Sequence, residues 1–198
     1  MNRQEWAARG NVLIAHAVAR AIALEPDFIL ADVMAFALFF VLFMVERRHQ
    51  VALFDESSRL LDANLGLLNT LILISSSWLV ALGVEAARHG WRVGLRRYLM
   101  LAIVVGGAFA VTKAIEYSTK IGQGITMMSN DFFMFYFALT GIHFLHFMVG
   151  IGALCMLWFQ AKEEDLEGPF MGWVESGGIY WHMVDLLWIV LFPMLYLL

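Results

Sequence analysis

The sequence predicts an all-α membrane protein built as a bundle of five transmembrane helices. Of its 198 residues, 61% are hydrophobic and only 15% are charged, and the mean hydropathy is +0.73. Soluble domains carry about 25% charged residues, and a chain of this length cannot bury so much apolar surface in water. The apolar residues also gather into five runs, each near the roughly 20 residues that a helix needs to cross a bilayer.

The five runs are expected to be helices, because backbone within lipid must satisfy its own hydrogen bonds and the alternation of a membrane barrel is absent. In chain order the expected spans are 28–46, 65–86, 97–119, 131–161 and 176–198. Few ionisable residues interrupt them: Asp32, Lys113, Glu116, His143, His146, His182 and Asp185.

Residues 1–26 form a separate N-terminal segment, and residues 27–198 form the transmembrane domain. Polar residues of the segment repeat at helical spacing, with apolar residues on the opposite face. This pattern predicts a short helix lying at the cytoplasmic membrane surface, which Pro26 would end. The connections 46–64 and 162–175 are too short to form soluble domains, and no secretory signal peptide is recognisable.

The distribution of Lys and Arg predicts a cytoplasmic N-terminus and a periplasmic C-terminus. Eight of these residues would lie on the N-terminal side: Arg3, Arg9, Arg20, Arg88, Arg92, Arg96, Arg97 and Lys162. Four would lie on the opposite side: Arg47, Arg48, Arg59 and Lys120. The expected location is the inner (cytoplasmic) membrane of a bacterium.

Charge and cysteine content exclude several classes of protein. The net charge of −4 gives no strong field for an anionic partner, so no nucleic acid is expected to bind. The single Cys155 forbids an internal disulfide. No Walker loop, dinucleotide fingerprint, HExxH motif or nucleophile elbow is present, so no active site is expected. The aromatic residues at 132–137 and 158–159 are expected to mark the membrane interfaces.

Asp32 lies in the first turns of its run, and two interpretations stand side by side. A carboxylate within a membrane is costly, by about 2.5–3.5 kcal/mol at a helix centre. Asp32 is therefore either a capped or snorkelling carboxylate near the interface or a protonatable group that faces a cavity.

His143 and His146 are three residues apart and share a helix face, near the middle of the bilayer. With His182 they could begin a haem or metal site. The alternative is hydrogen bonding between helices, with Asp185 as the partner of an imidazole, and this structural network is favoured because buried polar groups in lipid need partners.

Lys113, Glu116 and Lys120 also share one helix face. They predict an internal cluster of ion pairs near the outer end of their helix rather than a proton path. Asn69 lies near the start of its span, where polar side chains suit close helix packing.

Five segments resemble haem–copper oxidase (cytochrome c oxidase) subunit III, in the order of that family. Residues 137–150 (FALTGIHFLHFMVG) resemble its penultimate helix, and residues 175–188 (ESGGIYWHMVDLLW) resemble the start of its last helix. Upstream, residues 68–70 (LNT) and 113–117 (KAIEY) recur, and residues 29–36 (ILADVMAF) resemble its third helix. The resemblance runs from about residue 28 to residue 198.

Two departures from the seven-helix family fold stand out. The chain lacks the first two helices, which form one arm of a lipid-holding cleft, and Asp32 stands where Glu is usual. With residues 75–78 (SSSW), these departures are similar to a short branch associated with nitric oxide reductase.

The resemblance implies a non-catalytic accessory subunit with no redox metal or other cofactor of its own. It would bind beside a haem-bearing catalytic subunit that carries haem with copper or non-haem iron, and would support assembly, stability and proton uptake in aerobic respiration or denitrification. Bound phospholipid is compatible with it. The resemblance also implies an intramembrane polar network with structural, proton-related or lipid-related roles, made of Asp32, Asn69, Lys113, Glu116, His143, His146, Glu175, His182 and Asp185.

Two other classes stay open from the residues alone. One is a membrane protein that binds haem or metal through its histidines, and the other is a proton-coupled transporter that uses Asp32, Glu116 and Asp185. The internal repeats and broken helices common in transporters are not found in the sequence.

Overall fold

The structure, a computed structural model, describes residues 26–163, 166 and 168–198. Within them lie six helices and no strand: α2 (Pro26–His49), α3 (Val51–Ser58), α4 (Ala63–Arg88), α5 (Arg92–Gly122), α6 (Asp131–Gln160) and α7 (Pro169–Tyr196). Every helix of this set except α3 is long and apolar enough to cross a membrane. The predicted all-α, five-span class is therefore confirmed. The surface helix expected within residues 1–26 falls outside the described residues, apart from Pro26 itself.

The largest differences from the expected boundaries are at the starts of α5, which begins at Arg92 rather than at 97, and of α7. Helix α7 begins at Pro169, seven residues before the expected start at 176, because a proline fits the first helical turn, where its missing N–H would have no partner. Gly168, with φ at +102°, makes the sharp entry. The short α3 was not expected within the connection 46–64. Its own Phe54 side chain is buried against the bundle.

The long helices begin and end where local chemistry favours it. The carboxylate of Asp62 caps α4 by accepting from the backbone N–H groups of Asn64 and Leu65, at 2.9 and 3.2 Å. Asn130 caps α6 in the same way, by accepting from Phe133 N–H at 2.9 Å. Gly90, with φ at +69°, lets the chain turn from α4 into α5.

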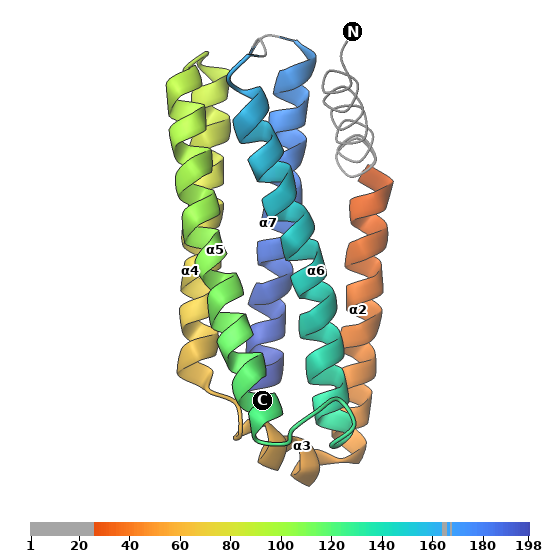
Figure 1. Ribbon diagram of the computed structural model, residues 1–198. Helices are drawn as coiled ribbons and strands as arrows, with labels where there is room; N and C mark the ends of the chain where they lie inside the picture. Colours follow the sequence, from red (N-terminus) through yellow and green to blue (C-terminus); the bar gives the residue numbers. More distant parts are fainter. Residues whose placement is uncertain (1–25, 164–165, 167) are drawn as a thin grey trace, which may run out of the picture.

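The five spans run antiparallel to their neighbours in the chain, and α7 occupies the centre (Figure 1). Helix α7 contacts α4 and α6, while α5 packs against α4 and α6. Helix α2 stands at the edge of the bundle, against α6 and α7. The short α3 lies across the end of the bundle where the C-terminus also lies (Figure 1).

Small residues let the central helix pack closely. A Cβ atom added to Gly106 of α5 would lie 3.0 Å from the indole of Trp181 on α7. One added to Gly150 of α6 would lie 2.9 Å from the same indole. Ser76 on α4 donates to the carbonyl of Ala102 on α5 at 2.8 Å. Close approach and interhelical hydrogen bonds hold helices together in lipid, where the hydrophobic effect does not.

The aromatic residues at 132–137 were expected to mark a membrane interface, but several of them are buried inside the bundle. Phe132 is buried and meets Phe54 edge to face, with ring centres 5.6 Å apart, and Phe54 meets Phe43 at 5.3 Å. Helix α3 covers these rings, so they form part of the core. Such edge-to-face pairs add about 0.5–1.5 kcal/mol each beyond the burial of area.

Candidate functional site

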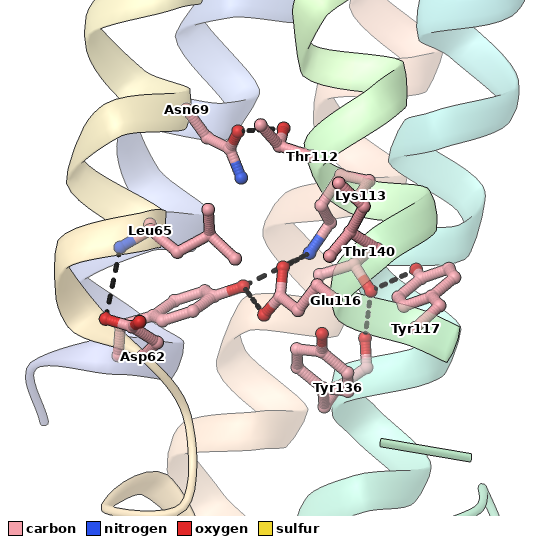
Figure 2. Close-up of polar contacts among 12 residues, drawn as sticks. Asp62, Leu65, Asn69, Thr112, Lys113, Glu116, Tyr117, Tyr136 and Thr140 are labelled. Carbon is pink, nitrogen blue, oxygen red and sulfur yellow. Dashed lines mark hydrogen bonds and ion pairs between the residues drawn. The ribbon is translucent and has the colours of Figure 1, made fainter. Parts of the chain in front are cut away.

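The most charged part of the interior is an ion pair within α5. Lys113 Nζ lies 2.8 Å from Glu116 Oε2, one helical turn away (Figure 2). Their side chains are only 1% and 3% exposed. Charges removed from water are costly unless they are paired and hydrogen-bonded, so each of these residues depends on the other.

Tyr196 at the end of α7 closes this pair. Its hydroxyl donates to Glu116 Oε1 at 2.6 Å and accepts from Lys113 Nζ at 3.1 Å. Both oxygens of the Glu116 carboxylate are therefore hydrogen-bonded, and α5 is joined to α7 (Figure 2).

Aromatic rings surround the ammonium group of Lys113. Its Nζ lies 5.1 Å from the ring centre of Trp188 and 5.2 Å from those of Tyr117 and Tyr136. A cation over an aromatic face is attracted by the ring quadrupole, more strongly when water is excluded. The rings thus replace part of the hydration that Lys113 loses.

Lys120 does not join the ion pair, and the expected three-residue ladder is wrong in this respect. Its ammonium group donates instead to the backbone carbonyl of Leu60, just after α3. Lys120 stands near the end of α5, so its long side chain reaches the connection before α4, where that carbonyl accepts from it.

Further contacts surround the ion pair on both sides (Figure 2). The hydroxyl of Thr112 donates to Asn69 Oδ1, which ties α5 to α4. Tyr117 Oη and Thr140 Oγ1 lie 2.6 Å apart, which ties α5 to α6. Asn69 Nδ2 is buried and finds no acceptor among the described residues. We use "internal polar cluster" below for Asn69, Thr112, Lys113, Glu116, Tyr117, Tyr136, Thr140 and Tyr196.

The histidines on α6 face different neighbours. His143 is fully buried, and its Nε2 pairs with the carbonyl of Val184 on α7 at 3.0 Å. His146 Nε2 lies 3.3 Å from Asp32 Oδ2 on α2, and its Nδ1 pairs with the carbonyl of Ile142. Asp32 therefore reaches an imidazole across a helix interface.

The expected pairing of Asp185 with His143 or His146 is not found among the described residues. His143 Nε2 pairs with the backbone carbonyl of Val184, and His146 Nε2 lies beside Asp32. Asp185 is buried, and its Oδ1 has no hydrogen-bond partner in the described part of the chain. His182, three residues before Asp185, lies 2.5 Å from the hydroxyl of Ser77 on α4 instead.

Glu175 is not a member of the internal network. Its carboxylate pairs with Arg88 at 2.9 Å, at the end of α4, and is 41% exposed. Because α7 begins earlier than expected, Glu175 lies near the rim of the bundle, where a charge remains close to water.

The sequence-predicted residues thus form separate contacts rather than one network, and the tyrosines were missed. Tyr136 and Tyr196 are buried beside Lys113, although aromatic residues near the ends of spans usually mark the interface. Within the described residues, no group of three or more His, Cys, Asp and Glu side chains is placed to hold a metal ion.

The fold and the internal polar cluster define a multi-pass helical membrane protein with a buried ion pair, Lys113 with Glu116, in its interior. Comparison with known proteins is more specific. The family model of cytochrome c oxidase subunit III matches residues 14–198. The chain therefore belongs to the cytochrome c oxidase subunit III family, as the five sequence motifs predicted.

Individual relatives are similar in sequence to most of this chain. A cytochrome c oxidase subunit 3 of Corynebacterium diphtheriae is 30% identical over 171 residues, which cover 85% of this chain and 83% of the relative. One of Synechocystis sp. is 31% identical over 172 residues, or 86% of this chain and 72% of the relative. A quinol oxidase subunit 3 of Bacillus subtilis is 25% identical over 173 residues, covering 86% and 83%.

Proposed function

We propose that this chain is a non-redox accessory subunit of a haem–copper oxidase, bound beside the catalytic subunit in a respiratory membrane. The observation that carries the proposal is the match of residues 14–198 to the subunit III family. Relatives named for cytochrome c oxidase and for quinol oxidase point to a respiratory oxidase with oxygen as acceptor.

The interior favours a structural role over chemistry. Lys113, Glu116 and Tyr196 satisfy each other at 2.6–3.1 Å, so the charged groups of the internal polar cluster are occupied. Polar contacts of this kind link α5 to α4, α6 and α7. We infer that they hold the bundle in one arrangement, and that haem and metal belong to the partner subunit.

The proposal includes a place in the cell. The chain lies in the inner membrane of a bacterium, with the loops rich in Lys and Arg, and hence the N-terminus, on the cytoplasmic side. Through its contact with the catalytic subunit it supports assembly, stability and proton uptake, and phospholipid covers the exposed apolar faces.

A tagged chain purified from its own membrane in mild detergent tests this function. We expect a large haem-bearing subunit to co-purify, and deletion of the chain to lower the respiratory activity of that membrane. Recovery as a homo-oligomer alone, together with unchanged respiration after deletion, would contradict the proposal.

Two measurements test the two alternative classes, a haem-binding protein and a proton-coupled transporter. A Soret band from the isolated chain would favour a haem protein. Proton flux into liposomes that hold only this chain, abolished by Asp32→Asn, would favour a transporter.

A nitric oxide reductase partner is a second proposal. It is supported by Asp32 in place of Glu and by residues 75–78. The short chain does not distinguish this branch, since the Corynebacterium diphtheriae oxidase subunit is comparable in length. The metals of the co-purified catalytic subunit decide between haem with copper and haem with non-haem iron.

A further inference from the structure

The outer face of α4 and α7 exposes an imidazole near the middle of these two helices. His182 is exposed at the surface of the bundle, and its Nδ1 lies 2.5 Å from Ser77 Oγ. Ser77 is 11 residues from the end of α4 and His182 is 13 residues from the start of α7, so both lie about 16–20 Å from the nearer helix end. An imidazole that faces hydrocarbon at this depth is costly and is expected to have a further partner.

Trp78 gives a second, independent observation on the same face. It is 64% exposed near the middle of α4, although tryptophan in membrane proteins gathers at the interfaces rather than at mid-depth. It is also one turn from Ala81, which shares a groove with His182. Large aromatic side chains at such positions are typical of protein–protein contacts.

A groove of about 370 Å³ runs between α4 and α7 from His182 to the rim. Ala81 is exposed along it, so a neighbouring helix can approach there, whereas the buried Gly178 makes room for Val84 of α4 within the bundle. Arg88 and Glu175 border its other end as an ion pair. The same face of α7 carries exposed apolar residues on both sides of His182: Ile179 within the groove, and Leu186 and Ile189 beyond it.

We propose that this face, defined by Trp78, Ala81, Ile179, His182 and Leu186, binds a transmembrane helix of the catalytic subunit that presents a hydrogen-bonding side chain at the depth of His182. The proposal rests on the proposed function and adds the surface to it. A lipid does not fit, because its polar headgroup stays near the rim marked by Glu175, about 10 Å from His182, and its acyl chains cannot hydrogen-bond.

Photo-crosslinking in the intact complex tests the surface. A photoreactive amino acid is placed at Ile179 or at Leu186, both 55–56% exposed. Matched controls are placed at Val111 on α5 and Leu145 on α6, which are 60% and 65% exposed. We expect adducts with the catalytic subunit from the two α7 positions and none from the controls.

The other outcomes are distinct. Adducts with the catalytic subunit from Val111 or Leu145 alone would place the contact on another face and overturn this inference while leaving the proposed function intact. Adducts of Ile179 with a second copy of the chain, or no protein adduct from either α7 position in a complex that still purifies, would overturn it as well. Failure of any catalytic subunit to co-purify would contradict the proposed function itself.

A substitution gives a second readout. His182→Leu is expected to weaken retention of the catalytic subunit about threefold to twentyfold, the range for interhelical hydrogen bonds in membranes. The fold is expected to persist, because the Ser77 hydroxyl can turn to a backbone carbonyl of its own helix. Leu145→Ala serves as the control, and equal retention of the partner by both variants would count against the surface.

Discussion

Asp32 on α2 and His146 on α6 approach to 3.3 Å between Oδ2 and Nε2, and this contact fastens the least buried span to the bundle. Helix α2 exposes apolar residues such as Met34 and Leu38 along most of its length. The ring of Phe36 adds an edge-on contact to the same imidazole, with centres 5.5 Å apart. This polar contact acts together with the buried Phe43, which packs the other end of α2 against Phe132 and Phe135 of α6.

Asp32→Ala is expected to lower the free energy of unfolding by about 0.5–1.5 kcal/mol, because it removes the carboxylate that lies 3.3 Å from His146 Nε2. Asp32→Asn retains a hydrogen-bonding side chain and should lose less. Titration of the purified chain with a denaturing detergent measures both. Met34→Ala, an exposed change on the same helix, is the control, and an Asp32→Ala midpoint equal to that of the control would refute the docking role.

Removing one member of the buried ion pair is expected to be more severe. Glu116→Leu strands the ammonium group of Lys113 in the interior and should cost about 3–5 kcal/mol. The double variant Lys113→Met with Glu116→Leu removes both charges and should recover most of this loss, since buried pairs are often replaceable by apolar groups.

The same unfolding titration reads out this double-mutant cycle. Ser118→Ala on the exposed side of α5 is the matched control, because its hydroxyl bonds only to the Ala114 carbonyl within the same helix. Additive losses in the double variant would show that the two charges do not depend on each other.

The five spans could be predicted because length and hydropathy alone decide what crosses a bilayer. The spacing of Lys113 and Glu116 also sufficed, since residues three apart on a helix meet whatever the tertiary fold. Lys120 has the same kind of spacing, but its long side chain found a carbonyl in a connection whose path the sequence does not state.

Contacts between helices could not be predicted from the spacing of residues in the sequence. Nothing in the spacing of His182 and Asp185 indicates that Ser77 on α4 contacts both of them. The burial of Tyr196 depends likewise on how α7 packs against α5, and it was missed because aromatic residues at span ends usually face the interface.

The position of Asp185 changes the expected effect of its removal. If Asp185 held an imidazole, Asp185→Ala would cost about 1–3 kcal/mol. Since His143 bonds to the carbonyl of Val184 and the Asp185 side chain bonds to Ser77, Asp185→Ala removes one interhelical contact and is expected to cost only about 0.5–1 kcal/mol. A loss above about 1 kcal/mol in the unfolding titration would point to a partner of Asp185 beyond the described contacts.

Two adjacent glycines on α5 provide the sharpest test of how the central helix packs. A Cβ atom on Gly106 would lie 3.0 Å from both the Trp181 ring and Ser76 Oγ, whereas one on Gly107 would meet nothing within 4 Å. Gly106→Ala must therefore push the indole or the serine aside, at a cost of about 1–3 kcal/mol. Gly107→Ala gains helix propensity without a clash and should be neutral or stabilising by up to about 1 kcal/mol.

Because the two sites share a helix, a depth in the membrane and a substitution, their difference isolates the contacts of position 106 with Trp181 and Ser76. The shift of the unfolding midpoint for each variant gives that difference directly. Stability equal in both variants would mean that α5 and α7 can separate at little cost, and α7 would then not be the rigid centre around which the other spans are arranged. A loss confined to Gly106→Ala would instead tie the position of α7 to the same pair of helices, α4 and α5, whose hydroxyl-to-carbonyl bond from Ser76 to Ala102 lies beside the indole.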